Sequence, residues 1–321
     1  MKFQHLFYCL FFISLWSCQT DTEKVPQERK KVKIPTFAAQ GAYELVEAQV
    51  NLGPRCPECP GADKAIDWMS SELKSAGWEV IKQTFDATLY TGKEVRGTNV
   101  IGRYNPHVKE RVMLCAHWDS RMIADKDTTR KEEPIAGAND GASGVGVILQ
   151  IAKTISENPI PMGVDVVFFD LEDQGKDGSS DEYSWGLGSQ YWAKNLPDDP
   201  YEVKYGILLD MVGAPDAEFP KEYYSMQNAK PVVDKVWKVA SILKKGNYFV
   251  NRRIGGITDD HKFIMEYARF PVIDIIHHKD DKFMAAHHTH ADDMRVIDKK
   301  TLGAVGQVVL STVYKESNGD F

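Results

Sequence analysis

One stretch of the sequence decides the fold: Val166-Val167-Phe168-Phe169-Asp170-Leu171-Glu172-Asp173. Its apolar residues form a continuous run, which is typical of a strand buried on both faces of a sheet. Three acids then fall within four positions, and neighbouring carboxylates repel one another unless a proton or a cation joins them. We therefore expect a buried strand whose carboxyl end carries a functional acidic site.

Other segments repeat this pattern along the chain. Short apolar runs at 111–116, 206–209 and 271–276 predict further buried strands, and 79–85 with 99–104 predicts a hairpin-like pair. Helical periodicity marks 38–51, 62–76, 143–152, 230–243 and 300–314. Strands that alternate with helices favour a single α/β domain with a central mixed, mostly parallel sheet flanked by helices. The long loop 174–185 is expected to border the pocket.

Side chains that bind metals recur at the predicted strand ends and in loops: His117, Asp140, Glu172, Asp173, Asp210 and His288. Each one has an ordinary structural explanation, such as a helix N-cap for Asp140. Their coincidence instead predicts one metal site, and histidine with carboxylate suits zinc. Glu172, as a carboxylate beside the metal, would carry protons. Asp119 could accept the proton of the second ring nitrogen of His117.

The N-terminal region predicts export. An apolar run from Leu6 to Trp16 is too short to span a membrane, and it ends at Ser17-Cys18, which resembles a lipoprotein signal. We expect residues 1–18 to be a signal peptide, 19–34 a flexible tether and 35–321 the folded domain. Cys18 would be the lipid anchor of a periplasmic protein in a Gram-negative bacterium, although Trp16 leaves ordinary signal-peptide cleavage open.

Composition narrows the partners. The 321 residues carry a net charge of −7, with 43% hydrophobic and 26% charged residues. This balance indicates a soluble domain with a large core and argues against nucleic acid as a partner. Cys56 and Cys59 are expected to form a short-range disulfide or to remain two free thiols, and Cys115 to be a packed core thiol.

Several phrases resemble those of the zinc-dependent aminopeptidase superfamily and, within it, the animal-type glutaminyl cyclases. The resemblance runs from about Leu52 to the C-terminus. It rests on Gly53-Pro54-Arg55 with Pro60-Gly61, Arg96-Gly97-Thr98-Asn99-Val100-Ile101, Cys115-Ala116-His117-Trp118-Asp119-Ser120, Gly137-Ala138-Asn139-Asp140-Gly141-Ala142-Ser143, Leu208-Leu209-Asp210-Met211-Val212-Gly213-Ala214-Pro215-Asp216 and Ile257-Thr258-Asp259-Asp260-His261.

That resemblance implies conversion of N-terminal glutamine to pyroglutamate with release of ammonia. One zinc ion per chain would be held by Asp140, Asp173 and His288, with Glu172 as the acid–base group. Asp210 and Asp259 would form an acidic array near the leaving group. Further residues are implied around this centre: His287, Trp185 and Phe283 for substrate binding, with His117, Asp119 and Asp274 behind the site.

The chain departs from the family at three positions. Asp173 stands where a second glutamate is usual, His287 where a tryptophan is common, and Asp274 where the animal enzymes carry other members of the acidic network. We expect a monomer that acts on peptides or proteins with N-terminal glutamine. A two-zinc aminopeptidase is the main alternative, because His117 and Asp210 are retained; a metal-free peptide-binding module is a third.

Overall fold

The computed structural model describes residues 1–2, 31–198 and 200–321, and the folded unit comprises Lys31–Phe321. Apart from Met1 and Lys2, the expected signal peptide lies outside the described residues, as does most of the expected tether. Residues 31–34 belong to the folded unit, since the backbone N–H of Val32 donates to Asn318 Oδ1 (2.8 Å) and Asn318 Nδ2 donates to the Val32 carbonyl (3.0 Å).

A mixed sheet forms the centre of the fold, and its strand order is β1-β2-β4-β3-β5-β8. β1 pairs antiparallel with β2, and β2 pairs antiparallel with β4, whereas the remaining pairs are parallel. This confirms the predicted hairpin and the mixed, mostly parallel sheet. The strands span Glu79–Thr88 (β1), Glu94–Tyr104 (β2), Arg111–His117 (β3), Gly163–Phe169 (β4), Gly206–Asp210 (β5) and Val272–Ile276 (β8).

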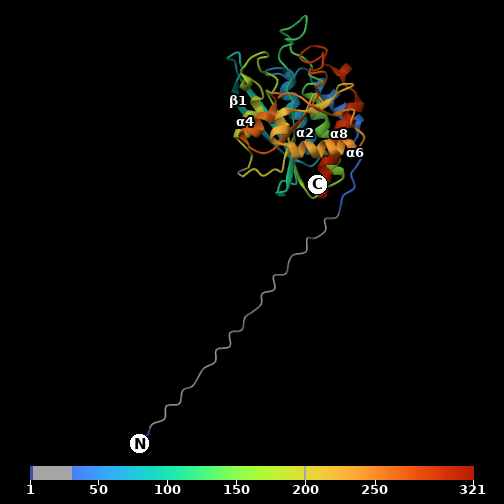
Figure 1. Ribbon diagram of the computed structural model, residues 1–321. Helices are drawn as coiled ribbons and strands as arrows, with labels where there is room; N and C mark the ends of the chain where they lie inside the picture. The colour runs from blue at the N-terminus through green and yellow to red at the C-terminus, as the bar shows by residue number, and fades with distance from the viewer. Residues whose placement is uncertain (3–30, 199) are drawn as a thin grey trace. The chain divides into compact units, whose positions relative to one another are not determined.

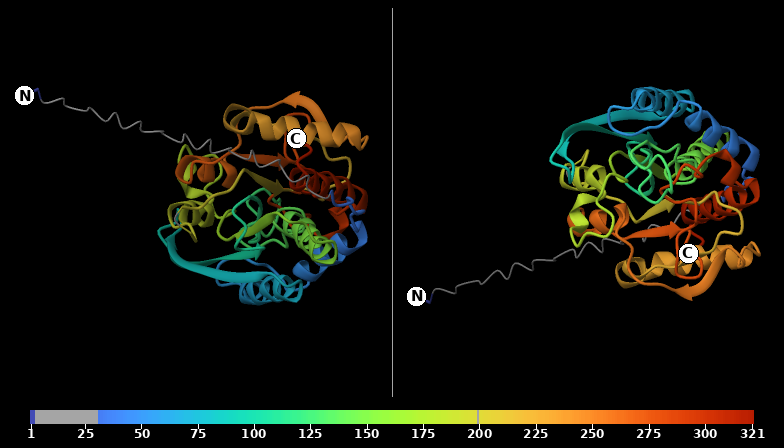
Figure 2. Two further views of the ribbon diagram at one scale, coloured as in Figure 1. Left: turned by 90° about the horizontal axis from the view of Figure 1, so that it is seen from below. Right: turned by 90° about the horizontal axis from the view of Figure 1, so that it is seen from above.

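Helices cover both faces of the sheet (Figures 1 and 2). Alternation along β3 explains the two layers: Leu114 packs into one core cluster, whereas Met113 and Cys115 pack into the other. The larger cluster includes α1 (Ala39–Val50), α2 (Pro60–Ser75), α3 (Ala142–Glu157), α6 (Lys230–Ile242) and α8 (Lys299–Ser317). The smaller one includes α4 (Leu187–Lys194) and α7 (Asp260–Tyr267).

Short elements were missed by the sequence patterns. α4, α5 (Tyr223–Asn228) and two 3₁₀ turns (Glu182–Ser184 and Met294–Val296) are each eight residues or shorter, as are β6 (Phe219–Lys221) and β7 (Phe249–Arg253), which pair in parallel. Segments of this length show little periodicity. Among the described residues, no helix is long and apolar enough to cross a membrane.

The cysteines follow the sequence expectations. Cys56 and Cys59 form a disulfide directly before α2, which selects one of the two open alternatives. Cys115 is fully buried in β3. Packing of the thiol between the central strands leaves it with a structural role.

Candidate active site

A cavity of about 350 Å³ opens at the carboxyl edge of the parallel strands. Nine of the twelve predicted site residues line it: Asp140, Glu172, Asp173, Trp185, Asp210, Asp259, Phe283, His287 and His288. The other three, His117, Asp119 and Asp274, are buried. A larger hollow of about 770 Å³ beside the β1–β2 hairpin contains none of the predicted residues. The chemistry therefore points to the smaller cavity.

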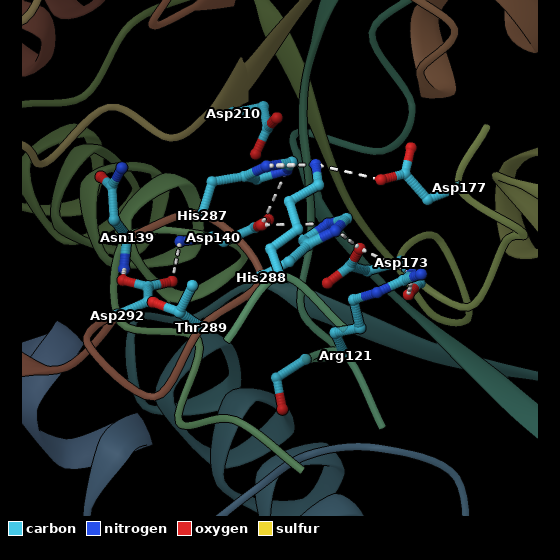
Figure 3. Close-up of polar contacts among 12 residues, drawn as sticks. Arg121, Asn139, Asp140, Asp173, Asp177, Asp210, His287, His288, Thr289 and Asp292 are labelled. Carbon is cyan, nitrogen blue, oxygen red and sulfur yellow. Dashed lines mark hydrogen bonds and ion pairs between the residues drawn. The ribbon is translucent and has the colours of Figure 1, made fainter. Parts of the chain in front are cut away.

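Asp140, Asp173 and His288 converge from three separate loops (Figure 3). His288 Nε2 lies 2.9 Å from Asp173 Oδ1 and 3.9 Å from Asp140 Oδ2. Both Asp140 Oδ2 and Asp173 Oδ2 are buried, and neither has a hydrogen-bond partner among the described residues. Unsatisfied carboxylate oxygens in the interior are costly, and a bound cation would satisfy them. Two carboxylates and one imidazole fit zinc well.

A loop after β3 lies beside His288, and sequence analysis did not identify it. His288 Nδ1 lies 3.5 Å from Asp125 Oδ1. Arg121 donates to both oxygens of Asp125, at 3.0 and 2.7 Å, and its third nitrogen donates to the Asp173 carbonyl at 2.7 Å. One guanidinium thus connects the supports of two candidate ligands. Carboxylate partners of this kind commonly fix the ring orientation of metal-binding histidines.

Asp140 is held by its backbone rather than used as a helix cap. Its N–H donates to Asp292 Oδ2 at 3.0 Å, and the preceding N–H of Asn139 donates to Asp292 Oδ1 at 2.8 Å. The N-cap of α3 is Gly141, at φ 95°, where an added Cβ would approach the Asp119 carbonyl to 2.5 Å. Only glycine fits there. The Asp140 carboxylate is therefore free for the cavity, and the N-cap explanation is excluded.

Glu172 and Asp173 follow a sharp turn, since Leu171, two residues after the end of β4, adopts φ 55°. Asp119 holds this turn by accepting the N–H of Glu172 (3.1 Å) and of Asp173 (3.2 Å). Its contact with His117 Nδ1 is longer, at 3.4 Å. Asp119 therefore supports the acidic pair more directly than it supports the histidine. Asp170 instead faces away and accepts the Thr98 N–H at 2.7 Å.

The acids in the cavity have perturbed proton affinities. Burial, reinforced by the charge of Asp259, raises the pKa of Glu172 well above its usual range. Burial likewise raises the pKa of Asp210 to about 7, although His117 opposes the shift. His117 Nε2 lies 3.0 Å from Asp140 Oδ1 and 3.1 Å from Asp210 Oδ1. Groups with such pKa values can exchange protons near neutral pH.

One part of the acidic array was overlooked. The sequence marks His261 only as the last residue of the Asp259-Asp260-His261 phrase, but it is fully buried, and its Nε2 donates to Glu222 at 3.0 Å. Its Nδ1 faces Asp274, 3.9 Å away. Burial and the nearby charge of Asp259 raise the pKa of Asp274 well above its usual range. Asp274 thus extends the array behind the cavity, and the tertiary fold alone reveals its histidine neighbour.

Aromatic rings form the wall of the cavity. Trp185, at the end of the loop expected to border it, stacks on His288 with ring centres 6.1 Å apart. The ring of Phe283 packs against the ring of His287, with ring centres 4.7 Å apart. Burial lowers the pKa of His287 to about 3, so its ring is neutral. The cavity therefore combines an apolar wall with an acidic floor.

The family model for peptidase family M28 matches residues 99–313. The chain therefore belongs to this family, which confirms the resemblance and the zinc exopeptidase type of fold. A glutaminyl cyclase structure from Bacteroides thetaiotaomicron, bound to N-acetylhistamine, is 42% identical, with a TM-score of 0.85 over 88% of this chain and 99% of that one.

Two further relatives bear on the activity. A structure described as a leucine aminopeptidase precursor from Bacteroides thetaiotaomicron has the same identity, TM-score and coverage. The bovine glutaminyl-peptide cyclotransferase is 22% identical over 286 residues, which cover 79% of this chain and 76% of that protein. Both activities considered from the sequence are thus represented among the relatives.

Proposed function

We propose that this enzyme is a zinc-dependent glutaminyl-peptide cyclotransferase, which converts N-terminal glutamine of peptides to pyroglutamate and ammonia. The observation that carries the proposal is Glu172, a cavity-lining carboxyl with a raised pKa beside Asp140, Asp173 and His288. The similarity to a bacterial and a bovine glutaminyl cyclase supports it. We assign one zinc ion per chain to those three residues.

When bound, zinc supplies a Lewis acid for the γ-carbonyl oxygen of the substrate glutamine. The α-amine forms a bond to the γ-carbon, and the bond from that carbon to the amide nitrogen breaks. Glu172 takes the proton that the amine loses and delivers it to the departing nitrogen, which leaves as ammonia. Asp210 and Asp259 keep this proton within the cavity, because they line it together with Glu172.

The cavity suits a short peptide end. A volume of about 350 Å³ accommodates one glutamine side chain and its backbone, with Trp185, Ile257 and Phe283 as apolar contacts. The reaction needs no water molecule, since the amine and the amide belong to one substrate. An apolar wall therefore helps cyclisation by excluding competing hydrolysis.

The two-zinc aminopeptidase is the second candidate, and one cluster favours it. His117, Asp140 and Asp210 bring ligand atoms within 4.8 Å of one another, which could hold a second ion. Two ions would activate water and anchor the free amine. Cyclisation is favoured because one ion and an intramolecular amine suffice for it, and because the long Leu208–Asp216 and Asp259-Asp260-His261 phrases resemble the cyclase branch.

The decisive experiment offers purified enzyme a Gln-initiated and a Leu-initiated peptide of otherwise equal sequence. We expect ammonia and a pyroglutamyl peptide from the first, no free amino acid from either, and no peptidase activity after excess zinc is added. The rate should rise from acid pH toward about 8, because the attacking amine must be neutral. Release of leucine at a rate rivalling cyclisation would replace the proposal with the aminopeptidase.

A further inference from the structure

Lys126 makes an unusual contact with the rim of the cavity. Its Nζ lies 3.0 Å from His287 Nδ1 and 3.4 Å from Asp177 Oδ2. The backbone N–H of Lys126 also donates to the His288 carbonyl at 3.3 Å. The lysine is therefore anchored beside both histidines, and Figure 3 shows His287 and Asp177 within this group of polar contacts.

The chemistry of the ammonium group fixes the proton on the imidazole. A lysine ammonium has three donors and no acceptor, so His287 Nδ1 must accept. In a neutral ring the proton then resides on Nε2. That nitrogen points toward Asp140 Oδ2 at 3.6 Å, which is too long for a hydrogen bond. The Nε2–H donor is thus directed toward the candidate zinc site without a partner of its own there.

The same contact argues against His287 as a metal ligand. Asp140, His287 and His288 do bring ligand atoms within 4.8 Å of one another. A metal bound at Nε2 would force the proton onto Nδ1, where it would face the ammonium of Lys126 donor to donor. His287 is therefore better suited to donate a hydrogen bond than to bind the ion.

We propose that Lys126 is a positioning residue that selects the Nε2–H tautomer of His287, and that His287 donates to the γ-carbonyl oxygen of the substrate glutamine. The inference rests on the proposed function. A substrate oxygen that approaches Asp140, Asp173 and His288 comes within reach of this donor. Asp177, on the other side of the ammonium, holds the lysine toward the ring.

The test measures the effect of Lys126→Met in two backgrounds, one with histidine and one with tryptophan as the donor at position 287. The variants are Lys126→Met, which keeps the aliphatic stem, His287→Phe, His287→Trp and the double variant Lys126→Met/His287→Trp. An indole N–H donates without any choice of tautomer, so it makes the lysine unnecessary. Lys131→Met, at an exposed position of the same loop, is the matched control.

With a Gln-initiated peptide, we expect Lys126→Met to lower kcat roughly tenfold with little change in KM, and His287→Phe to lower it roughly 100-fold, as loss of a donor to a developing oxyanion does. In the His287→Trp background, Lys126→Met should cost less than twofold. Equal losses in both backgrounds, or no loss in either, would overturn the proposal. So would loss of zinc in His287→Phe, because it would make His287 a ligand.

A second measurement does not depend on activity or on any variant at position 287. Nitrogen-15 NMR of histidine-labelled protein distinguishes the two neutral tautomers. We expect the His287 signal to show Nε2–H in the native enzyme and a mixture in Lys126→Met. A native Nδ1–H tautomer would overturn the inference even if cyclisation is confirmed. Absence of cyclisation by the native enzyme would instead refute the proposed function.

Discussion

Glu172 lines the cavity and is only 8% exposed, and burial together with Asp259 raises the pKa of its carboxyl. Glu172→Gln keeps the shape of the side chain but cannot accept a proton. We expect turnover to fall by about 10² to 10⁴, the range for loss of a general acid–base group. Zinc content and melting temperature should remain near those of the native enzyme. Glu133→Gln, at an exposed position, is the control, and normal turnover in Glu172→Gln would contradict the mechanism.

Asp140 and His288 provide the test of the metal site itself. Elemental analysis after dialysis should find close to one zinc per native chain. Asp140→Ala and His288→Ala each remove one ligand of three, so we expect both to lose the ion and the activity. His107→Ala, an exposed histidine, should retain both. Zinc retained in the two ligand variants would require a different ligand set.

At the scale of elements, the segment before α2 secures the loop that carries Asp140. The guanidinium of Arg55 is buried and donates to the carbonyls of Trp118 (2.9 Å), Ala136 (2.7 Å) and Gly137 (2.7 Å). Burial lowers its pKa to about 10, which still leaves it charged at neutral pH. One side chain thus ties the segment before α2 to the end of β3 and to the loop before α3.

Arg55→Met should therefore affect stability and metal binding together. Three carbonyls would lose a charged donor, and we expect the free energy of unfolding to fall by roughly 3 kcal/mol or more. Zinc affinity should fall as well, because the 136–140 loop would loosen. Urea unfolding and zinc titration measure the two effects. Arg96→Met, whose partner Asp86 is exposed, should change neither; an unchanged zinc affinity in Arg55→Met would show that the loop holds its shape alone.

At the scale of elements, much of the candidate site could be predicted because its residues stand at the ends of predicted strands. His117, Asp210 and the Glu172–Asp173 pair follow apolar runs, and parallel strands bring their carboxyl ends to one edge. Arg121, Asp125 and Lys126 could not be found in this way. They lie in an irregular segment after β3, and their roles depend on contacts with Asp173, His287 and His288, which are distant in sequence. Resemblance supplied Trp185 and Phe283, which no local pattern marks.

At the scale of the whole molecule, Glu316 connects α8 to α6 and to the segment that leads into β5. Lys204 Nζ lies 2.6 Å from Glu316 Oε1, and Lys235 Nζ and the Tyr205 hydroxyl donate to Oε2 at 2.7 and 3.2 Å. Burial raises the pKa of Glu316, but the two lysines outweigh it and leave the pKa below its usual value. The ionised carboxylate is therefore the form that the fold prefers.

This preference predicts a pH-dependent contribution to stability. A lowered pKa in the folded state stabilises the protein above the unfolded value of about 4.3, and the contribution is lost as the pH falls below it. Glu316→Gln should reduce the free energy of unfolding at pH 7 by about 1 to 2 kcal/mol, since the lysines are partly exposed. The difference should shrink at about pH 3, because the carboxyl takes up its proton below the unfolded value. A loss that is equal at both pH values would assign the effect to packing instead.

The layered architecture followed from the alternation of apolar strands and amphipathic helices, because burial on both faces dictates that pattern. The parallel β6–β7 pair and the buried contact between Glu222 and His261 did not follow, since each depends on residues 30 or more positions apart. Sequence patterns record which faces are apolar. They do not record which short segments will meet across the surface of a finished core.

The two ends of the described fold are fastened to each other, which determines how the molecule would bear a mechanical load. Val32 exchanges two hydrogen bonds with Asn318, and Lys31 pairs with Asp320 just beyond α8. At the other end of α8, the N–H of its N-cap residue Asp298 donates to the Gly213 carbonyl. The helix is about 28 Å long, so this contact lies far from the Val32–Asn318 pair. A pull on residue 31 would therefore load the C-terminal end of that helix first. The other end of α8 is the one near the candidate site, because the N–H of Gly213 donates to Asn139 Oδ1 beside Asp140 (2.7 Å). A force applied from the N-terminal side would therefore enter the fold one helix length away from the Asp140 loop.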